Sequence, residues 1–140
     1  MRLLRFVTVL FVVCTVSVGA LAFAGAKDPL FVSVTTDDDY RSTLATNVIS
    51  KRMLELGHPL TVFFSDRGIL VISKANGEKF KVQQTALAEL AKAGATLIAC
   101  PSCMKHYGIN ESDLLAGIKV GNPRMLSDAL FQDNTKTLAW

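Results

Sequence analysis

Residues 98–108 read IACPSCMKHYG, an apolar run that ends in a cysteine, followed at once by a proline and then by a second cysteine. Such a run is typical of a buried strand, and Pro101 suits the first position of a helix, where a missing N–H loses no partner. The pattern predicts that a strand ends at Ala99 and that a short helix begins after Cys100. Because a helix N-terminus favours a thiolate, Cys100 is the first candidate reactive group.

The rest of the chain alternates between short apolar runs and helical patterns. The segments expected as strands are 30–34, 60–64, 95–99, 117–121 and 135–140. The segments expected as longer helices follow the aspartates 37–39 as far as Gly57, cover 81–93, and run from 122 to 131. This alternation predicts one three-layer α/β domain, whose mainly parallel sheet is covered on both faces. In such sheets reactive groups collect outside the carboxyl ends of the strands, where Cys100 is expected.

The first 26 residues have the composition of an export signal. Arg2 and Arg5 precede an uncharged apolar run, and small residues gather at its end, where a signal peptidase cleaves. We expect a signal peptide over residues 1–24, cleaved near 24–26, and a domain over 25–140; the alternative is an uncleaved membrane anchor. The mature chain is then periplasmic or secreted and has no membrane segment.

Loss of that segment changes the charge balance. The 140 residues include 15 Lys and Arg against 12 Asp and Glu, a formal net charge of +3. Without Arg2 and Arg5 the balance becomes 13 against 12, or +1, so no basic surface remains to indicate nucleic acid binding. Loss of Cys14 leaves Cys100 and Cys103, a pair that can be oxidised in an exported protein.

Two cysteines three positions apart support several kinds of chemistry. In one, Cys100 is a thiolate that attacks or holds sulfur, and Cys103 resolves the product or closes a disulfide. Lys105 and His106 would then add positive charge. In another, the pair is part of a soft-metal site for copper or zinc; its ligands would be Cys100, Cys103, Met104 and His106.

Two further interpretations of the pair remain open. A thioredoxin-like oxidoreductase also uses the C-x-x-C motif, although there the motif normally follows the first strand of the domain. The structural interpretation is a local disulfide, or two inert thiols, in a protein whose task is to bind other proteins, because buried cysteines are inert unless their surroundings are electropositive.

The arrangement resembles the DsrE/DsrF/TusD-like family of sulfur-relay proteins. The resemblance covers Leu30 to Trp140 and rests on an N-terminal strand with a long helix, and on a second strand that ends in a loop with Asp66 and Gly68. Its most specific element is the late strand that ends in a cysteine followed by a short helix and a glycine, residues 100–108.

The resemblance implies a flavodoxin-like α/β fold and a sulfur carrier or transfer protein rather than a stand-alone enzyme, with no cofactor. In the family, the cysteine at this strand end carries sulfur as a persulfide, and Cys100 is the matching position. A sulfur donor or acceptor protein is then an expected partner, and homo-oligomers, often trimers or hexamers, are expected as well. Two features depart from the well-known relay members: the export signal and the second thiol, Cys103.

Overall fold

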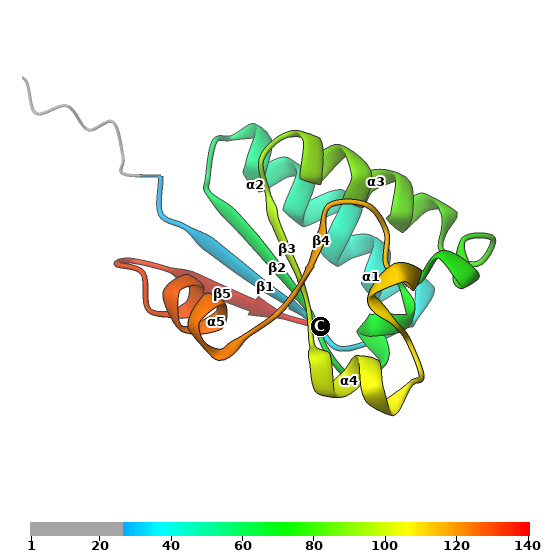
Figure 1. The fold of residues 1–140 in the computed structure, drawn as a ribbon. Helices are drawn as coiled ribbons and strands as arrows, with labels where there is room; N and C mark the ends of the chain where they lie inside the picture. Colours follow the sequence, from blue (N-terminus) through cyan, green and yellow to red (C-terminus); the bar gives the residue numbers. More distant parts are fainter. Residues whose placement is uncertain (1–26) are drawn as a thin grey trace, which may run out of the picture.

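The computed structural model describes residues 27–140, and its centre is a parallel sheet of five strands (Figure 1). The expected signal peptide lies outside the described residues. The strands are β1 Leu30–Val34, β2 Leu60–Phe64, β3 Thr96–Ala99, β4 Ile118–Val120 and β5 Lys136–Ala139. The helices are α1 Asp39–Thr43, α2 Lys51–Glu55, α3 Lys81–Lys92, α4 Pro101–His106 and α5 Pro123–Leu130. Within the described part of the chain, every helix is too short or too polar to traverse a lipid bilayer.

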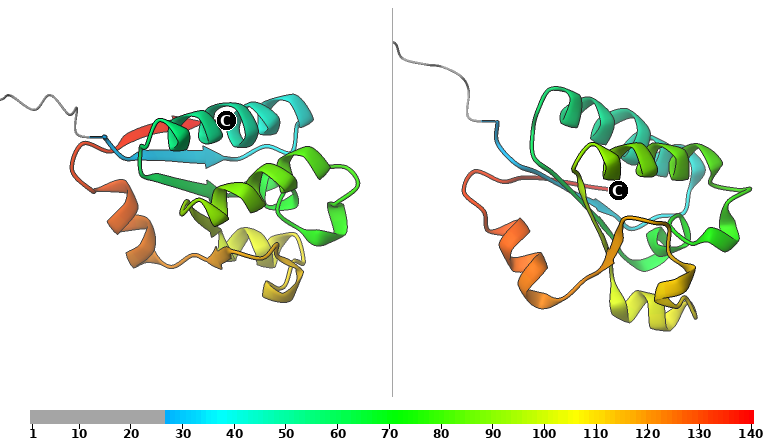
Figure 2. Two further views of the ribbon diagram at one scale, coloured as in Figure 1. Left: turned by 90° about the horizontal axis from the view of Figure 1, so that it is seen from above. Right: turned by 45° about the horizontal axis from the view of Figure 1, so that its top comes forward.

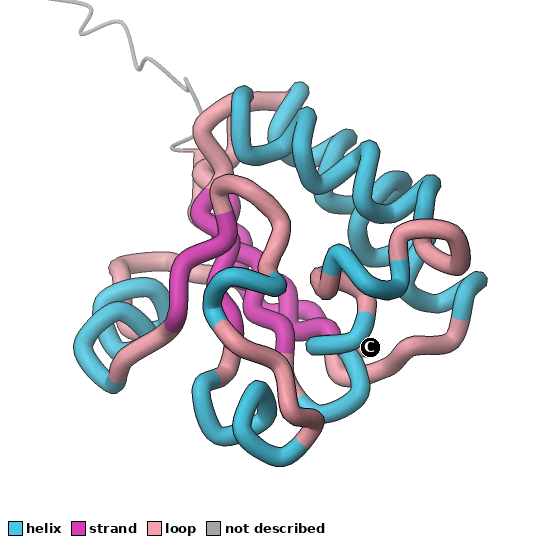
Figure 3. The backbone as a smooth tube through the Cα atoms, turned by 45° about the vertical axis from the view of Figure 1, so that its right-hand side comes forward, coloured by secondary structure: helices cyan, strands magenta, loops and turns pink. Residues whose placement is uncertain are grey.

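The strand order is β4-β3-β2-β1-β5, and every pairing is parallel, which confirms the expected α/β sheet. The chain moves in one direction from β1 to β4, so right-handed crossovers place α1, α2 and α3 on the same face (Figure 2). Between β4 and β5 the chain crosses the whole sheet in reverse, and α5 lies on the opposite side of the strands (Figure 3). The expected three layers are present, and α5 alone forms the third layer in residues 27–140.

The hydrophobic core lies between the sheet and the helices α1, α2 and α3. Alternate residues of β1, β2 and β3 are buried in it, and each fully buried apolar side chain contributes roughly 1.5–3 kcal/mol. The buried strand residues of this core are Leu30, Val32, Val34, Leu60, Val62, Phe64, Leu97 and Ala99. They pack with Leu87 and Leu90 of α3. The segment after β2, which its sequence alone does not classify, forms the 3₁₀ turn Asp66–Leu70 and then buries Val71 and Ile72.

The long helix expected before Gly57 is present, but it is not α-helical throughout. A π-helical segment, Leu44–Ser50, joins α1 to α2. The side chain of Ser50 has the i to i−5 spacing of a π-helix, since its hydroxyl donates to the carbonyl of Ala45, five residues earlier. Asp38 caps the start of α1 by accepting a hydrogen bond from the backbone N–H of Arg41 at 2.8 Å. This cap fixes the loop that leaves β1.

The register of β2 and β3 determines which segments lie side by side at the carboxyl edge of the sheet. Phe64 is paired with Ala99, so the two strands end level with one another. The backbone N–H of Cys100 continues this ladder by donating to the carbonyl of Phe64 at 2.9 Å. The loop after β2 and the helix after β3 therefore begin side by side at the carboxyl edge of the sheet.

Candidate functional site at the ends of β2 and β3

The junction of β3 and α4 forms as expected from the Cys-Pro step. Cys100 has extended backbone angles (φ −71°, ψ 114°) and is the N-cap residue of α4, with Pro101 in the first turn. The carbonyl of Cys100 accepts the N–H of Met104 at 2.9 Å, which closes the first helical turn. Met104 is buried in the core and holds the short helix against the sheet.

Cys100 and Cys103 form a disulfide, with their Cα atoms 5.2 Å apart. Cys100 is only 9% exposed, whereas Cys103 is half-buried and packs at the edge of the core. Sγ of Cys100 accepts a hydrogen bond from the N–H of Cys103 at 3.3 Å and lies 3.2 Å from Oγ of Ser102. One of the redox states expected for an exported C-x-x-C pair is therefore the one in this structure.

Asp66 connects the loop after β2 to α4. Its backbone N–H donates to Sγ of Cys103 at 3.2 Å, and its carboxylate accepts from the hydroxyl of Tyr107 at 2.9 Å. The hydrogen bond to Asp66 raises the pKa of Tyr107 above its usual value, because it stabilises the protonated phenol. Asp66 has φ 46°, a left-handed conformation that is uncommon outside glycine and that aspartate tolerates better than most residues.

Asp37 ties the loop after β1 to the same region. Its carboxylate receives two hydrogen bonds from the guanidinium of Arg67, at 2.7 and 2.9 Å, and one from Lys79 at 3.1 Å. The hydrogen bonds from Arg67, and then the one from Lys79, lower the pKa of Asp37 from 3.8 to about 2. Arg67 directly follows Asp66, so this ion-pair cluster holds the turn that presents the Asp66 N–H to the disulfide.

Gly68 allows that turn to lie against β1. A Cβ atom at this position would come within 2.0 Å of the carbonyl oxygen of Val34, so only glycine fits. The N–H of Ser65 donates to the same carbonyl of Val34 at 3.0 Å. The four residues of the Ser-Asp-Arg-Gly sequence after β2 thus each contact a neighbouring segment of the chain.

An open cavity of about 500 Å³ lies over this junction. Its lining comes from the two neighbouring segments and includes one sulfur of the disulfide. The lining residues are Ser65, Asp66, Ser102, Cys103, His106 and Tyr107. A smaller cavity of about 240 Å³, between α2 and α3, is lined mainly by aliphatic side chains and the Lys51–Glu89 ion pair. That second cavity contains no cysteine or histidine, so the cavity beside Cys103 is the candidate site.

A model of the DsrE/DsrF-like family matches residues 29–135, nearly all of the described chain. The protein belongs to the DsrE/DsrF-like family. Among curated proteins, none shows significant sequence similarity to this chain. The family match confirms the resemblance expected from the strand that ends in Cys100 and from the loop that contains Asp66 and Gly68.

Two solved structures show how far the DsrE-like fold extends over the chain. MTH1491 from Methanobacterium thermoautotrophicum, a protein of unknown function, is 17% identical with a TM-score of 0.65. The alignment covers 81% of this chain and 99% of MTH1491. YchN from E. coli is 20% identical with a TM-score of 0.61, and 80% of this chain and 99% of YchN are covered. At these identities the two structures establish the shared fold.

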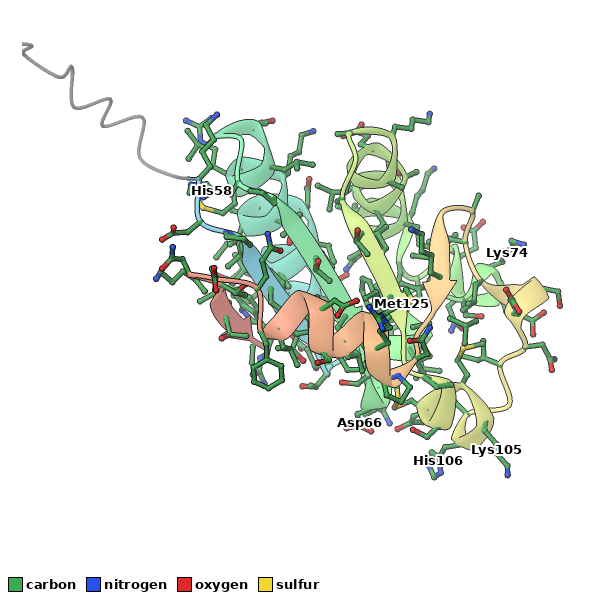
Figure 4. The ribbon with its side chains drawn as sticks, turned by 60° about the vertical axis from the view of Figure 1, so that its left-hand side comes forward. His58, Asp66, Lys74, Lys105, His106 and Met125 are labelled. Atoms are coloured by element: carbon green, nitrogen blue, oxygen red, sulfur yellow. A yellow bond between two sulfur atoms is a disulfide. The ribbon has the colours of Figure 1, made fainter. Side chains whose placement is uncertain are left out.

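The site residues expected from the sequence of this DsrE-like protein separate into two groups. Cys100, Cys103 and His106 lie at the junction, and Cys103 and His106 line its cavity. Lys105 is exposed and points away from α4, outside the cavity lining (Figure 4). Met104 lies in the core, which removes it from the set proposed for a soft metal. Over residues 27–140, no group of three or more His, Cys, Asp or Glu side chains is arranged to hold a metal ion.

Sequence reasoning assigned no role to Ser102 or Tyr107, although both lie in the stretch 98–108. Ser102 contacts the sulfur of Cys100, and Tyr107 contacts the carboxylate of Asp66. The signal for Ser102 was its position inside the C-x-x-C motif. The partner of Tyr107 lies 41 residues earlier in the chain, and only the pairing of β2 with β3 brings the two together.

Proposed function

We propose that this protein carries sulfur as a persulfide on Cys100 and passes it to a partner protein, with Cys103 as the resolving thiol. The observation that carries the proposal is the position of Cys100, at the carboxyl end of β3 in a DsrE-like sheet, where the family resemblance expects the sulfur-bearing cysteine. Sulfur carriage and transfer also fit the shape of the cavity beside the pair, which is open to solvent.

Hydrogen bonds at the pair support a thiolate on Cys100. In the disulfide form, the N–H of Cys103 and the hydroxyl of Ser102 lie 3.3 and 3.2 Å from its sulfur, and we expect both to donate to it after reduction. Donors of this kind lower the pKa of a thiol, and the thiolate is the form that attacks sulfur. His106 lines the adjoining cavity, on the same side of the junction as Cys103.

The test is incubation of the reduced protein with a polysulfide donor, followed by intact-mass measurement. We expect a gain of one sulfur atom in the wild type and in Cys103→Ser, and its loss on treatment with a reductant. Cys100→Ser is expected to gain clearly less, because the sulfur of its remaining thiol, Cys103, has only the Asp66 N–H as a polar neighbour. Equal sulfur uptake by Cys100→Ser would overturn the assignment of the carrier residue.

We further propose that the protein is exported and works in an oxidising compartment. The support is the sequence of the first 26 residues, with two arginines before an apolar run and small residues at its end. Expression of the full chain and N-terminal sequencing of the product are expected to show cleavage near residues 24–26. A product that retains Met1 and separates with the cytoplasmic fraction would contradict export.

Members of the family often form oligomers, and we propose a homo-oligomer, a trimer or hexamer, for this chain. Its support is an exposed apolar group on α5, the residue after it and β5: Leu130 is 39%, Phe131 82% and Leu138 40% exposed. Light scattering with size-exclusion chromatography is expected to give three or six times the chain mass. Phe131→Asp is expected to reduce that mass, while Val82→Asp, on the opposite helical layer, leaves it unchanged.

A further inference from the structure

The two sulfurs of the disulfide differ in their access to solvent. Cys103 lines the open cavity, whereas Cys100 is 9% exposed and is absent from the cavity lining. A nucleophile attacks a disulfide at one sulfur and expels the other, so access decides which sulfur receives the new bond. From the cavity, Cys103 is the sulfur that can be reached.

Hydrogen bonding also distinguishes the two sulfurs, and it too favours attack on Cys103. The sulfur that is expelled leaves as a thiolate, and a better-stabilised thiolate leaves faster. Sγ of Cys100 has two polar neighbours, the N–H of Cys103 at 3.3 Å and Oγ of Ser102 at 3.2 Å. Sγ of Cys103 has the N–H of Asp66 at 3.2 Å, and the carboxylate of the same residue is part of the cavity wall. Cys100 is therefore the better leaving group.

Building on the proposed function, we propose that the oxidised protein receives sulfur first on Cys103, from a small sulfur nucleophile in the cavity. The nucleophile that gives a persulfide is hydrosulfide; a compact thiolate can attack the same sulfur but leaves a mixed disulfide on Cys103. The carboxylate of Asp66 in the wall disfavours a donor with several negative charges, and the open shape of the cavity gives a small anion direct access. In this proposal Cys103, the thiol that a simple relay does not require, is the residue that receives sulfur first.

The first step balances without any additional oxidant. Hydrosulfide attacks Sγ of Cys103, the bond from Cys103 to Cys100 breaks, and its electron pair leaves with Cys100 as a thiolate. A new sulfur–sulfur bond joins the incoming sulfur to Cys103, and the proton stays on the terminal sulfur. The incoming sulfide is oxidised by the disulfide, and Cys100 is reduced.

The second step moves the sulfur to the carrier position. The Cys100 thiolate attacks the terminal sulfur of the persulfide on Cys103. The bond between that sulfur and Cys103 breaks, and its electron pair remains on Cys103 as a thiolate. The product is a persulfide on Cys100, the form that the proposed function passes to a partner.

The test uses the oxidised protein and follows where an added group appears first. The protein is mixed with hydrosulfide in one arm and with N-acetylcysteine in the other, quenched in acid within seconds, and alkylated with a maleimide. Peptic peptides are then fragmented between Cys100 and Pro101, which separates the two cysteines. At the earliest times we expect at least about tenfold more extra sulfur, or N-acetylcysteine, on Cys103 than on Cys100.

The outcomes separate this proposal from the function on which it rests. An adduct that appears first on Cys100, or equally on both, overturns the role of Cys103 even if the reduced protein takes up sulfur from a polysulfide. If the reduced protein also gains no sulfur, the proposed function itself fails. Reaction with N-acetylcysteine but not with hydrosulfide would overturn the sulfide-fed persulfide step.

Ser102→Ala tests the leaving-group half of the proposal. Loss of the hydroxyl near Sγ of Cys100 is expected to slow the attack on Cys103 about two- to fivefold, as for the loss of one hydrogen bond. Ser127→Ala is the matched control, since Ser127 is exposed on α5, and its rate is expected to equal that of the wild type. A Ser102→Ala rate equal to the control would overturn the stabilisation of Cys100 as the leaving thiolate.

Discussion

The backbone N–H of Asp66 donates a hydrogen bond to Sγ of Cys103 over 3.2 Å. Asp66 begins the turn after β2 and Cys103 lies in α4, so the bond joins the segments that follow two neighbouring strands. Asp66 is held at φ 46°, and conformations of this kind persist only where the surroundings fix them. The hydroxyl of Tyr107, which donates to the Asp66 carboxylate at 2.9 Å, is one of the groups that fix it.

Tyr107→Phe is predicted to weaken this connection while leaving the aromatic ring in place. Because the hydrogen bond to the Asp66 carboxylate is lost, we expect a small decrease in the free energy of unfolding. Urea denaturation measures it. Tyr40→Phe is the control, because Tyr40 is 71% exposed and its substitution is expected to leave the unfolding curve unchanged. Identical curves for the two variants would contradict a role for the Tyr107 hydroxyl.

Asp37→Asn is predicted to lower stability in a pH-dependent way. The pKa of Asp37 falls from 3.8 to about 2 on folding, a difference that corresponds to roughly 2.5 kcal/mol at most. Because the side chains of Arg67 and Lys79 are each 57% exposed, screening reduces the expected loss to about 1 kcal/mol at neutral pH.

The sign of this pH dependence follows from the lowered pKa of Asp37. The stabilisation is fully present above pH 3.8 and disappears as the pH falls through 2, so wild type and Asp37→Asn converge over that window. Chemical denaturation at several pH values measures the difference. Asp133→Asn is the control: it changes an exposed loop residue, and its free energy of unfolding is expected to match that of the wild type near neutral pH. A constant gap between Asp37→Asn and the wild type down to pH 2 would contradict the ion-pair explanation.

The sequence predicted the elements whose signals are local. The apolar run before Cys100 and the proline after it are sufficient to place the end of β3 and the start of α4. Asn122 and Pro123 identify the start of α5 in the same way, since the Asn122 side chain accepts the N–H of Met125 at 2.9 Å. Such caps involve residues close together in the sequence, so they can be recognised from the sequence of a single chain.

The contacts that complete the site are not local and were not predicted. Arg67 contacts Asp37 across 30 residues, and both positions depend on the parallel register of β1 with β2. The π-helical segment 44–50 was also missed, because apolar spacings of three to five fit an α-helix equally well. Cys103 is more exposed than Cys100, and the spacing of the two cysteines in the sequence does not predict this difference.

Gly68→Ala is predicted to be strongly destabilising. The new Cβ would lie 2.0 Å from the carbonyl oxygen of Val34, a backbone atom that cannot rotate away. We expect a loss of about 2 kcal/mol or more in the free energy of unfolding, as for overpacking of a rigid site. Gly77→Ala is the control: its nearest contact is 3.3 Å and its φ is ordinary, so we expect a change below about 1 kcal/mol. Comparable losses in the two variants would refute the close approach at Gly68.

Reduction of the disulfide is predicted to destabilise the protein only moderately. Cys100 and Cys103 are three positions apart, and the entropy of closing so short a loop corresponds to about 2 kcal/mol. Part of that loss is offset because the Cys103 N–H and Ser102 hydroxyl can donate to a Cys100 thiolate. We therefore expect dithiothreitol to lower the free energy of unfolding by about 1–2 kcal/mol, without unfolding the chain.

Cys103→Ser provides the control for this measurement, since it has no disulfide to lose and its stability is expected not to respond to dithiothreitol. A loss well above about 2 kcal/mol in the wild type would indicate that the disulfide is a structural staple, as in the inert-pair interpretation. A protein that remains folded with both thiols free can pass between the oxidised and reduced states, and the receipt of sulfur on Cys103 requires that passage.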